Sequence, residues 1–370
     1  NVMDAMAPVT RPVVRPCIGP YGDTIRRHII PGMFYLEFIG HVLGDDVDYT
    51  PEIETTPHTR FSMSMTTVRF HITQALLNGM NNPALSTSGY MGNSMFLEPE
   101  WVLFLRNERA WFEGIRSIAP QRGTRCGVQL IFDFDSTKAN PNPIDDVNDQ
   151  NWPAFMLCDV LGNMGFAYTF DDSPVRFLAG DTVYALPDTQ LQELLSGNLI
   201  LDASAAKALV DRGYAGQVGC SPGEAIAPFG GEECTDVDFF GPYVGDFFSH
   251  KATPLQAIRQ LNIADSAKVL SHIIDHDRKR VAPGMILFEN ALGGKIAVFA
   301  CRIGSSDPDT RHLVCYQRQW VMRQILAWMA PESMPVFVES PKDFAVQCWD
   351  DGNRLLACIT NLSYDNTDEI

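Results

Sequence analysis

The chain has 370 residues, with 28 lysines and arginines against 45 aspartates and glutamates, a net charge of −17, and 45% hydrophobic residues. Its length allows two or three packed domains, and its ordinary hydrophobic content excludes a disordered or fibrous protein. An excess of acidic groups repels a phosphate backbone, so we set nucleic acid aside as a partner. No apolar run reaches the roughly 18 residues that a membrane span needs, so no membrane partner is expected.

The N-terminal residues and the cysteines bear on the compartment. Residues 1–6 contain no basic start followed by an apolar stretch, so no signal peptide is visible. Nine cysteines form no Cys-x-x-Cys pair, and their odd number disfavours a dense disulfide framework. We predict reduced, buried thiols and a cytoplasmic protein. Because the chain does not begin with Met, a longer product, including a secreted one, stays open.

Residues 1–123 alternate between strand and helix signals. Short apolar runs of strand length are followed by helical spacing, as in the recurrence of Val68, Ile72 and Leu76. Such a ladder of strands and helices predicts a parallel sheet. The predicted strands cover 13–21, 47–54 and 83–90, and the predicted helices cover 24–43, 61–76 and 98–115.

A change of composition after Gly123 predicts a second α/β domain over residues 124–335. It begins with the apolar strand 128–134, and its clearest signature is a helix, a strand and a second helix between 186 and 214. A helix over 318–329 closes it. Residues 336–370 contain three strand-like runs, which we interpret as the start of a third, β-rich domain.

Two carboxylates, Glu52 and Glu54, are the best candidates for chemistry. Residues i and i+2 of a strand point the same way, so both side chains share a face where the predicted strand ends. Parallel barrels keep their catalytic groups at these carboxyl ends, and a carboxylate there serves as nucleophile or base. The alternative interpretation is that both are hydrogen-bonded loop residues.

The arrangement resembles the last three βα units of a clan A glycoside hydrolase barrel, in particular family 42 β-galactosidases and family 164 β-mannosidases. The resemblance rests on the Glu-x-x-Pro turn at 54–57, the amphipathic helix after it, and a downstream α/β domain with the stretch 194–206. It implies the C-terminal half of a (β/α)8 TIM barrel over 1–123, and a Rossmann-like oligomerisation domain over 124–335 that forms trimers or dimers. The start of a C-terminal β-domain would then cover 336–370.

The same resemblance implies an enzyme that hydrolyses β-linked galactosides or mannosides with retention of configuration. We expect no cofactor and predict no metal-binding residues, and whether the activity depends on a metal stays open. Glu54 would be the nucleophile, and Glu52 a flanking residue or the alternative nucleophile. Retention needs a second carboxyl group roughly 5–5.5 Å away, on the other side of the sugar. In the resembled barrels this acid/base is on strand four, which would precede Asn1. We therefore expect a fragment that is silent in catalysis by itself.

Four further residues are predicted to contact the carbohydrate substrate. Tyr21, at the end of the first strand, would hydrogen-bond the nucleophile, and His58 and Arg60 would meet sugar hydroxyls or hold Glu52. Tyr90 would stack on a sugar ring, although the resembled enzymes often carry Trp nearby. The structural alternatives are packed aromatic rings for the tyrosines and helix capping or an ion pair for His58 and Arg60.

Other interpretations stay open. One is a non-catalytic carbohydrate-binding or assembly protein of the same fold. Another is a Mg²⁺-dependent phosphatase, because the run from Asp133 to Thr137 matches the Asp-x-Asp-x-Thr of haloacid-dehalogenase-type phosphatases, with Asp133 as nucleophile. His272 and His276 have the spacing of a helical metal site but lack the Glu of the zinc protease motif, so we predict a polar helix face.

Overall fold

The computed structural model describes most of the chain. The described residues are 12–17, 22–23, 29–54, 63–87, 98–120, 123–139, 153–226, 230–248, 258–303, 314–332, 334–339 and 344–363. The chain divides into two units, one with Asn1–Arg125 and Trp349–Leu356, the other with Cys126–Cys348 and Ala357–Ile370. We call them unit 1 and unit 2. The three-domain scheme drawn from the sequence stays a prediction.

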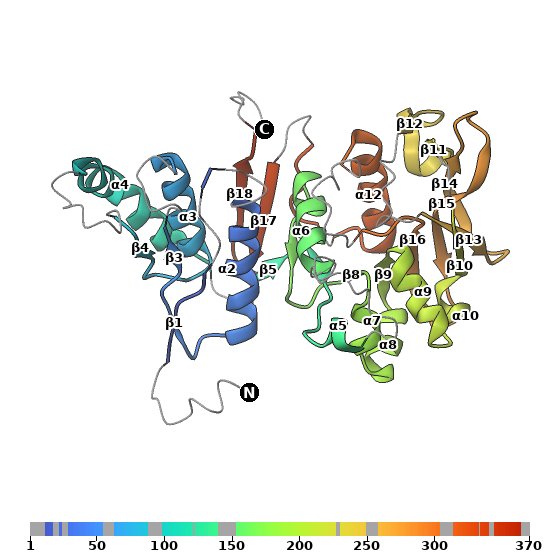
Figure 1. Cartoon of the computed structure of the whole chain (residues 1–370), viewed down its shortest axis with the longest axis horizontal. Coiled ribbons are helices and arrows are strands. Elements are labelled where there is room, and N and C mark those ends of the chain that lie inside the picture. The colour runs from blue at the N-terminus through green and yellow to red at the C-terminus, as the bar shows by residue number, and fades with distance from the viewer. Residues whose placement is uncertain are drawn as a thin grey trace. The chain divides into compact units, whose positions relative to one another are not determined.

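Unit 1 has the predicted order of strands and helices (Figure 1). β1 pairs with β2 in parallel, Cys17 bridges Glu52 in parallel, and β3 pairs with β4 in parallel. Three neighbouring chain segments therefore run in the same direction, each followed by a helix. The elements are β1 (Val13–Val14), α2 (Ile30–Leu43), β2 (Asp48–Tyr49), β3 (Glu52–Ile53), α3 (Met65–Leu77), β4 (Ala84–Leu85) and α4 (Pro99–Ile118).

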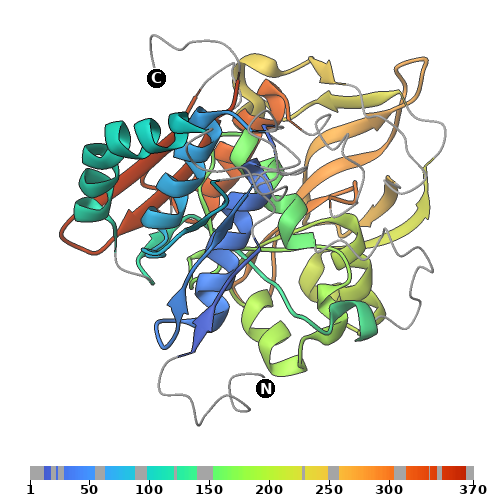
Figure 2. The same ribbon diagram turned by 60° about the vertical axis from the view of Figure 1, so that its left-hand side comes forward.

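The helices of unit 1 pack on one face of these strands. Ile53 is fully buried in a cluster with Leu36 of α2, Ile72 of α3 and Trp101 of α4. Helices α3 and α4 lie side by side (Figures 1 and 2). Side chains alternate along a strand, so the neighbours of Ile53 point to the opposite face. On that face Val13 is 62% exposed, which is unusual for a strand valine. We call the face of these strands that lies opposite the helices the open face.

Unit 2 is built on a nine-stranded mixed sheet in the order β12-β11-β14-β15-β16-β9-β8-β6-β7. Five adjacent strands of this sheet pair in parallel. If these five are numbered 1 to 5 along the chain, their order across the sheet is 2-1-3-4-5, one of the common doubly wound orders. The other four extend the sheet by antiparallel pairing. The parallel strands are β6 (Val128–Leu130), β7 (Tyr168–Thr169), β8 (Val175–Leu178), β9 (Asn198–Leu201) and β16 (Lys295–Phe299). The antiparallel strands are β11 (Gly231–Cys234), β12 (Phe247–Phe248), β14 (Lys268–Ile274) and β15 (Arg280–Glu289).

The centre of this sheet is buried on both faces. Leu199, Ile200 and Leu201 in β9 are all fully buried, as expected of a parallel strand that helices cover on both sides. Helix α9 (Ala203–Asp211) packs against β9 and β16. Its N-terminus is capped by the buried Asp202, whose carboxylate accepts a hydrogen bond of 2.8 Å from the Ala205 amide.

A buried ion pair anchors helix α12 (Tyr316–Met329) to the sheet. Arg318 Nη2 lies 2.9 Å from Glu232 Oε2 of β11, and the two side chains are 3% and 2% exposed. The Ser271 hydroxyl of β14 donates to the same carboxylate. Gly284 of β15 makes room for this group, because a Cβ there would lie 2.8 Å from both Glu232 Oε1 and Ser271 Oγ.

Two smaller sheets complete the described structure. β10 (Cys220–Ala225) pairs with β13 (Arg259–Ile263), and β18 (Leu355–Asn361), β17 (Phe344–Asp350) and β5 (Arg125–Cys126) form a three-stranded sheet. The short helices are α5 (Ser136–Ala139), α7 (Thr182–Ala185), α10 (Ala215–Val218), α11 (Val237–Phe240) and the 3-10 helix η4 (Gly241–Tyr243), with the longer α6 (Pro153–Asn163) and α8 (Asp188–Leu195). The fold is thus mixed α/β with several sheets, and the described strands close no barrel. No helix among the described residues has the length and apolar character for a membrane span.

Candidate functional site

The end of β3 places Glu52 and Glu54 beside each other along the strand. Glu52 donates its amide to the Pro16 carbonyl at 2.9 Å, and Ser86 donates its amide to the Ile53 carbonyl at 3.1 Å. The strand is therefore bonded to a neighbour on each side up to its last residue. Ile53 faces the helices, so the neighbouring Glu52 is on the open face, and Glu54 follows directly after the strand.

Glu52 has a charged partner at this strand end. Glu52 forms an ion pair with Arg15, which precedes the Cys17 bridge, and the two side chains are 15% and 57% exposed. A guanidinium fixes the orientation of its carboxylate partner. Glu54 is half-buried at the strand end.

The functional groups at this strand end are carboxylates. A carboxylate attacks an electrophilic carbon or accepts a proton. Glu52 and Glu54 come from one strand, so they cannot flank a substrate from opposite sides, as a two-carboxylate mechanism requires. Any such mechanism here needs a second carboxyl group from another segment.

The other predicted contacts to a sugar lie outside the described residues. Tyr21, His58, Arg60 and Tyr90 all belong to this group. Their roles stay predictions.

Asp133 follows β6, at the carboxyl edge of the sheet. β6 lies between β7 and β8, which is where the order of the parallel strands reverses, and such switch points are the usual ligand sites of open α/β sheets. However, Asp133 Oδ1 accepts a hydrogen bond of 2.8 Å from the Asp135 amide, and Asp135 pairs with Lys138 at 2.8 Å. Within the described residues, no three His, Cys, Asp or Glu side chains group to hold a metal ion.

The helix predicted around His272 and His276 is wrong. His272 is in strand β14, and His276 is in the turn after it. His272 Nδ1 lies 3.0 Å from the Thr235 hydroxyl. Burial lowers the pKa of His272, and the nearby Arg280 lowers it further, against the opposite effect of Glu233. The strand conformation removes the shared helix face on which the four-residue spacing depends.

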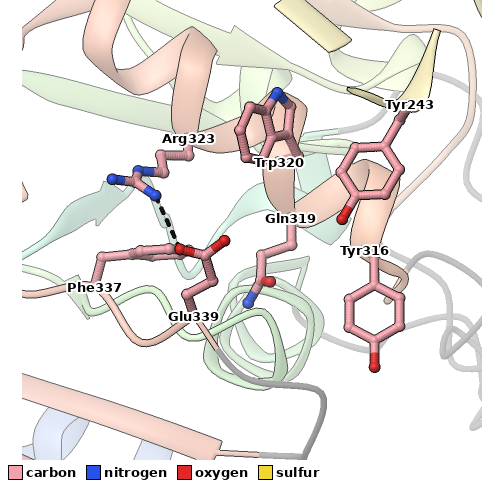
Figure 3. A pocket seen from close by; sticks show the side chains of 7 residues that line it. All are labelled: Tyr243, Tyr316, Gln319, Trp320, Arg323, Phe337 and Glu339. Carbon is pink, nitrogen blue, oxygen red and sulfur yellow. Dashed lines mark hydrogen bonds and ion pairs between the residues drawn. The ribbon is translucent and has the colours of Figure 1, made fainter. Parts of the chain in front are cut away.

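A cavity in unit 2 was not anticipated from the sequence. It has a volume of about 170 Å³ and opens beside α12 (Figure 3). The signal that could have revealed it is the spacing i, i+3, i+4, i+7 from Tyr316, which puts four polar or aromatic residues on one face of α12. We call it the α12 pocket. Its lining residues are Tyr243, Tyr316, Gln319, Trp320, Arg323, Phe337 and Glu339.

Comparison with known proteins adds no family to this description. No protein-family model matches the sequence, and no curated protein is significantly similar to it.

Proposed function

We propose that the chain is part of a retaining β-glycosidase, in which Glu54 is the nucleophile and Glu52 is the flanking residue. The observation that carries the proposal is the geometry of unit 1. Parallel strands, each followed by a helix, have helices on one face and carboxylates at the carboxyl end of the middle strand on the other. Catalytic groups of TIM barrels occupy this position.

The proposed architecture is the C-terminal half of a barrel in unit 1 and a Rossmann-like domain in unit 2. The open face would then line the interior of the barrel, which explains why a strand valine such as Val13 is exposed there. The doubly wound order of the parallel strands in unit 2 supports the second assignment. Formation of trimers or dimers through unit 2 is part of the proposal.

The proposed reaction needs one group from this strand end and one from elsewhere. An oxygen of Glu54 would attack the anomeric carbon of a β-linked galactoside or mannoside, and the aglycone oxygen would leave with the electron pair of the broken bond. A protonated carboxyl group on another strand of the barrel would supply the proton to that oxygen. Water would then cleave the glycosyl ester and restore Glu54. The ion pair with Arg15 would orient Glu52 beside the sugar.

The test uses the longest native product that contains this chain. It is treated with 2,4-dinitrophenyl 2-deoxy-2-fluoro-β-galactoside and the corresponding β-mannoside, whose leaving group departs without a proton. We expect one of them to form a stable glycosyl ester on Glu54, located by peptide mass spectrometry. A label on Glu52 would exchange the two roles, and a protein that carries no label on either residue would contradict the proposal.

Chemical rescue provides a second readout. We expect Glu54→Gly to lower kcat by at least about 10⁴-fold, the scale of the loss when a covalent catalyst loses its nucleophile. Azide should restore turnover of an aryl glycoside and yield the α-glycosyl azide, because the small anion takes the place of the carboxylate. Glu52→Gln is the matched control, and it should show no azide product. Full turnover by a Glu54→Ala protein would overturn the nucleophile assignment, and a full-length protein that shows no turnover at all would favour the non-catalytic carbohydrate-binding or assembly protein.

A phosphatase centred on Asp133 is the second candidate, favoured by the position of Asp133 beside the switch point. Its expected reaction is Mg²⁺-dependent release of phosphate from p-nitrophenyl phosphate, lost in Asp133→Asn. Asp135→Asn is the companion variant, because both carboxylates would face the ion. Release that does not change without Mg²⁺ or in Asp133→Asn would exclude it.

A further inference from the structure

The aromatic side chains of the α12 pocket are held in place by unit 2 itself. Trp320 rests on Gly241, where a Cβ would lie only 3.2 Å from its Cζ2 atom. The Trp320 and Tyr243 rings meet edge to face, with centroids 5.8 Å apart and planes at 67°. On the other wall the Phe337 ring packs on Phe166 at 4.9 Å. Rings fixed in this way offer apolar surface at little entropic cost.

A compensated ion pair borders the same pocket. The Arg323 guanidinium lies 5.0 Å from the Phe337 ring centroid, and its Nη1 lies 3.3 Å from Glu339 Oε2. Figure 3 shows this group at one end of the pocket and the phenols of Tyr243 and Tyr316 at the other. Both side chains of the pair are exposed, at 49% and 63%, so their remaining donors and acceptors can reach a ligand.

Gln319 contributes an oriented amide between these two ends. Its Nε2 donates to the Met164 carbonyl at 2.8 Å and to the Val338 carbonyl at 3.2 Å. These bonds fix which end of the amide is the oxygen, and Oε1 accepts no hydrogen bond from the described part of the chain. An acceptor in a fixed direction suits a hydroxyl group of a ligand.

Size and charge define the ligand class. A cavity of about 150 Å³ accepts one benzene molecule, so the volume of about 170 Å³ suits a single six-membered ring. The charges of Arg323 and Glu339 cancel, and the net charge of −17 disfavours an anion. The lining offers apolar ring faces together with both donors and acceptors. A pyranose has the matching properties, because one of its faces is apolar and its rim carries hydroxyl groups.

We propose that the α12 pocket binds one neutral pyranose unit of a glycan. It lies wholly within unit 2, whereas Glu54 belongs to unit 1. The inference depends on the pocket residues alone, so it stands or fails separately from the nucleophile assignment.

The experiment measures binding of three probes to the full chain. Methyl β-D-galactopyranoside, methyl β-D-mannopyranoside and methyl β-D-glucopyranoside are titrated, with saturation-transfer NMR and calorimetry as the readouts. We expect at least one of them to bind, and Tyr316→Ala and Arg323→Met each to weaken that binding about three- to ten-fold. Both replaced side chains are exposed, so the variants should fold, which circular dichroism checks.

Two control variants separate the pocket from other sites. Gln324→Ala changes the same helix outside the pocket lining and should leave binding unchanged. Glu54→Gln is titrated as well, to detect glycoside bound at the end of β3 rather than in the pocket. Loss of binding in Glu54→Gln alone would place the sugar at the end of β3 and would overturn the proposal that the α12 pocket binds it. Failure of all three glycosides to bind, binding that both pocket variants retain in full, or binding of phenol in preference to every glycoside would overturn it as well.

Discussion

Each unit has an ion pair between an acidic strand residue and an arginine, and the two pairs differ in how far they are buried. In unit 1, Glu52 is paired with Arg15 on the open face, where the two side chains are 15% and 57% exposed. In unit 2, Glu232 is paired with Arg318 between a sheet and a helix, where the exposed fractions are 2% and 3%. The pairs have the same chemistry and differ in what covers them.

This difference separates structural carboxylates from carboxylates that can react. Removing a charge from water costs several kcal/mol per ion, so the buried Glu232 needs its guanidinium and hydroxyl partners at all times. A carboxylate that is partly exposed keeps some of its hydration, so it depends less on its partner. We proposed above that the carboxylates at the end of β3 react with a substrate. Four predictions test this contrast between the open face and the closed core.

The largest effect is expected at the buried pair. Arg318→Met leaves the carboxylate of Glu232 buried without its cation, which should lower the free energy of unfolding by about 3–5 kcal/mol. Urea unfolding of the full chain, followed by tryptophan fluorescence and circular dichroism, measures it. The double variant Arg318→Met/Glu232→Leu should recover much of the loss, because no isolated charge remains. Equal losses in the single and double variants would contradict this account.

Thiol accessibility gives the next largest contrast. Cys17 is exposed, and it aligns with Glu52 on the open face. Burial raises the pKa of Cys220, Cys234 and Cys301 to about 12. At pH 8 a thiol of that pKa is ionised to about one part in 10⁴, so these three should react with iodoacetamide at least about a hundred-fold more slowly than Cys17.

Mass spectrometry of the labelled peptides follows each thiol separately. The three buried thiols should react quickly only in urea. If Cys17 reacts as slowly as they do in the native product, another segment covers the open face.

A smaller effect separates the two faces of β3. Ile53→Val removes one methylene from the fully buried face and should cost about 1 kcal/mol. The neighbouring Glu52→Gln affects a pair whose arginine is largely exposed, so it should cost no more than about 1 kcal/mol and should respond to salt. Denaturation at low and high salt measures both. A salt-dependent loss in Ile53→Val would contradict the assignment of faces.

The smallest effect concerns pH. The folded pKa of His272 is lowered by burial, so the neutral ring is the form that the fold prefers. The stability that this provides is present above the unfolded value of 6.5 and is lost as the pH falls through the folded pKa. The urea midpoint should therefore fall between pH 7 and pH 5, and His272→Gln should flatten this slope. An unchanged slope would assign the pH dependence to other groups.

Local pattern predicted much of the chain because the signals are short-range. The recurrence of Val68, Ile72 and Leu76 defined the helix observed as α3, and the apolar run 199–201 defined β9. The short strand observed as β3 lies within the strand predicted over 47–54. These features depend on neighbours within a few positions, which a sequence displays directly.

Local sequence pattern does not predict which distant segments pair. The four-residue spacing of His272 and His276 predicts a helix there, but His272 belongs to β14, whose strand conformation depends on pairing with β11 and β15. Strand propensity is weak compared with the packing of cross-strand neighbours. The nine-stranded sheet therefore appears only when all its partners are known.

The sequence by itself determined the acidic charge and the order of strands and helices in unit 1. The tertiary structure alone decided which faces are covered and which residues meet across the chain. It paired Glu232 with Arg318, 86 positions away, and joined Tyr243 with Trp320 in one pocket. Periodicity depends on residues that are close in the sequence, whereas burial depends on which surfaces the folded chain brings together.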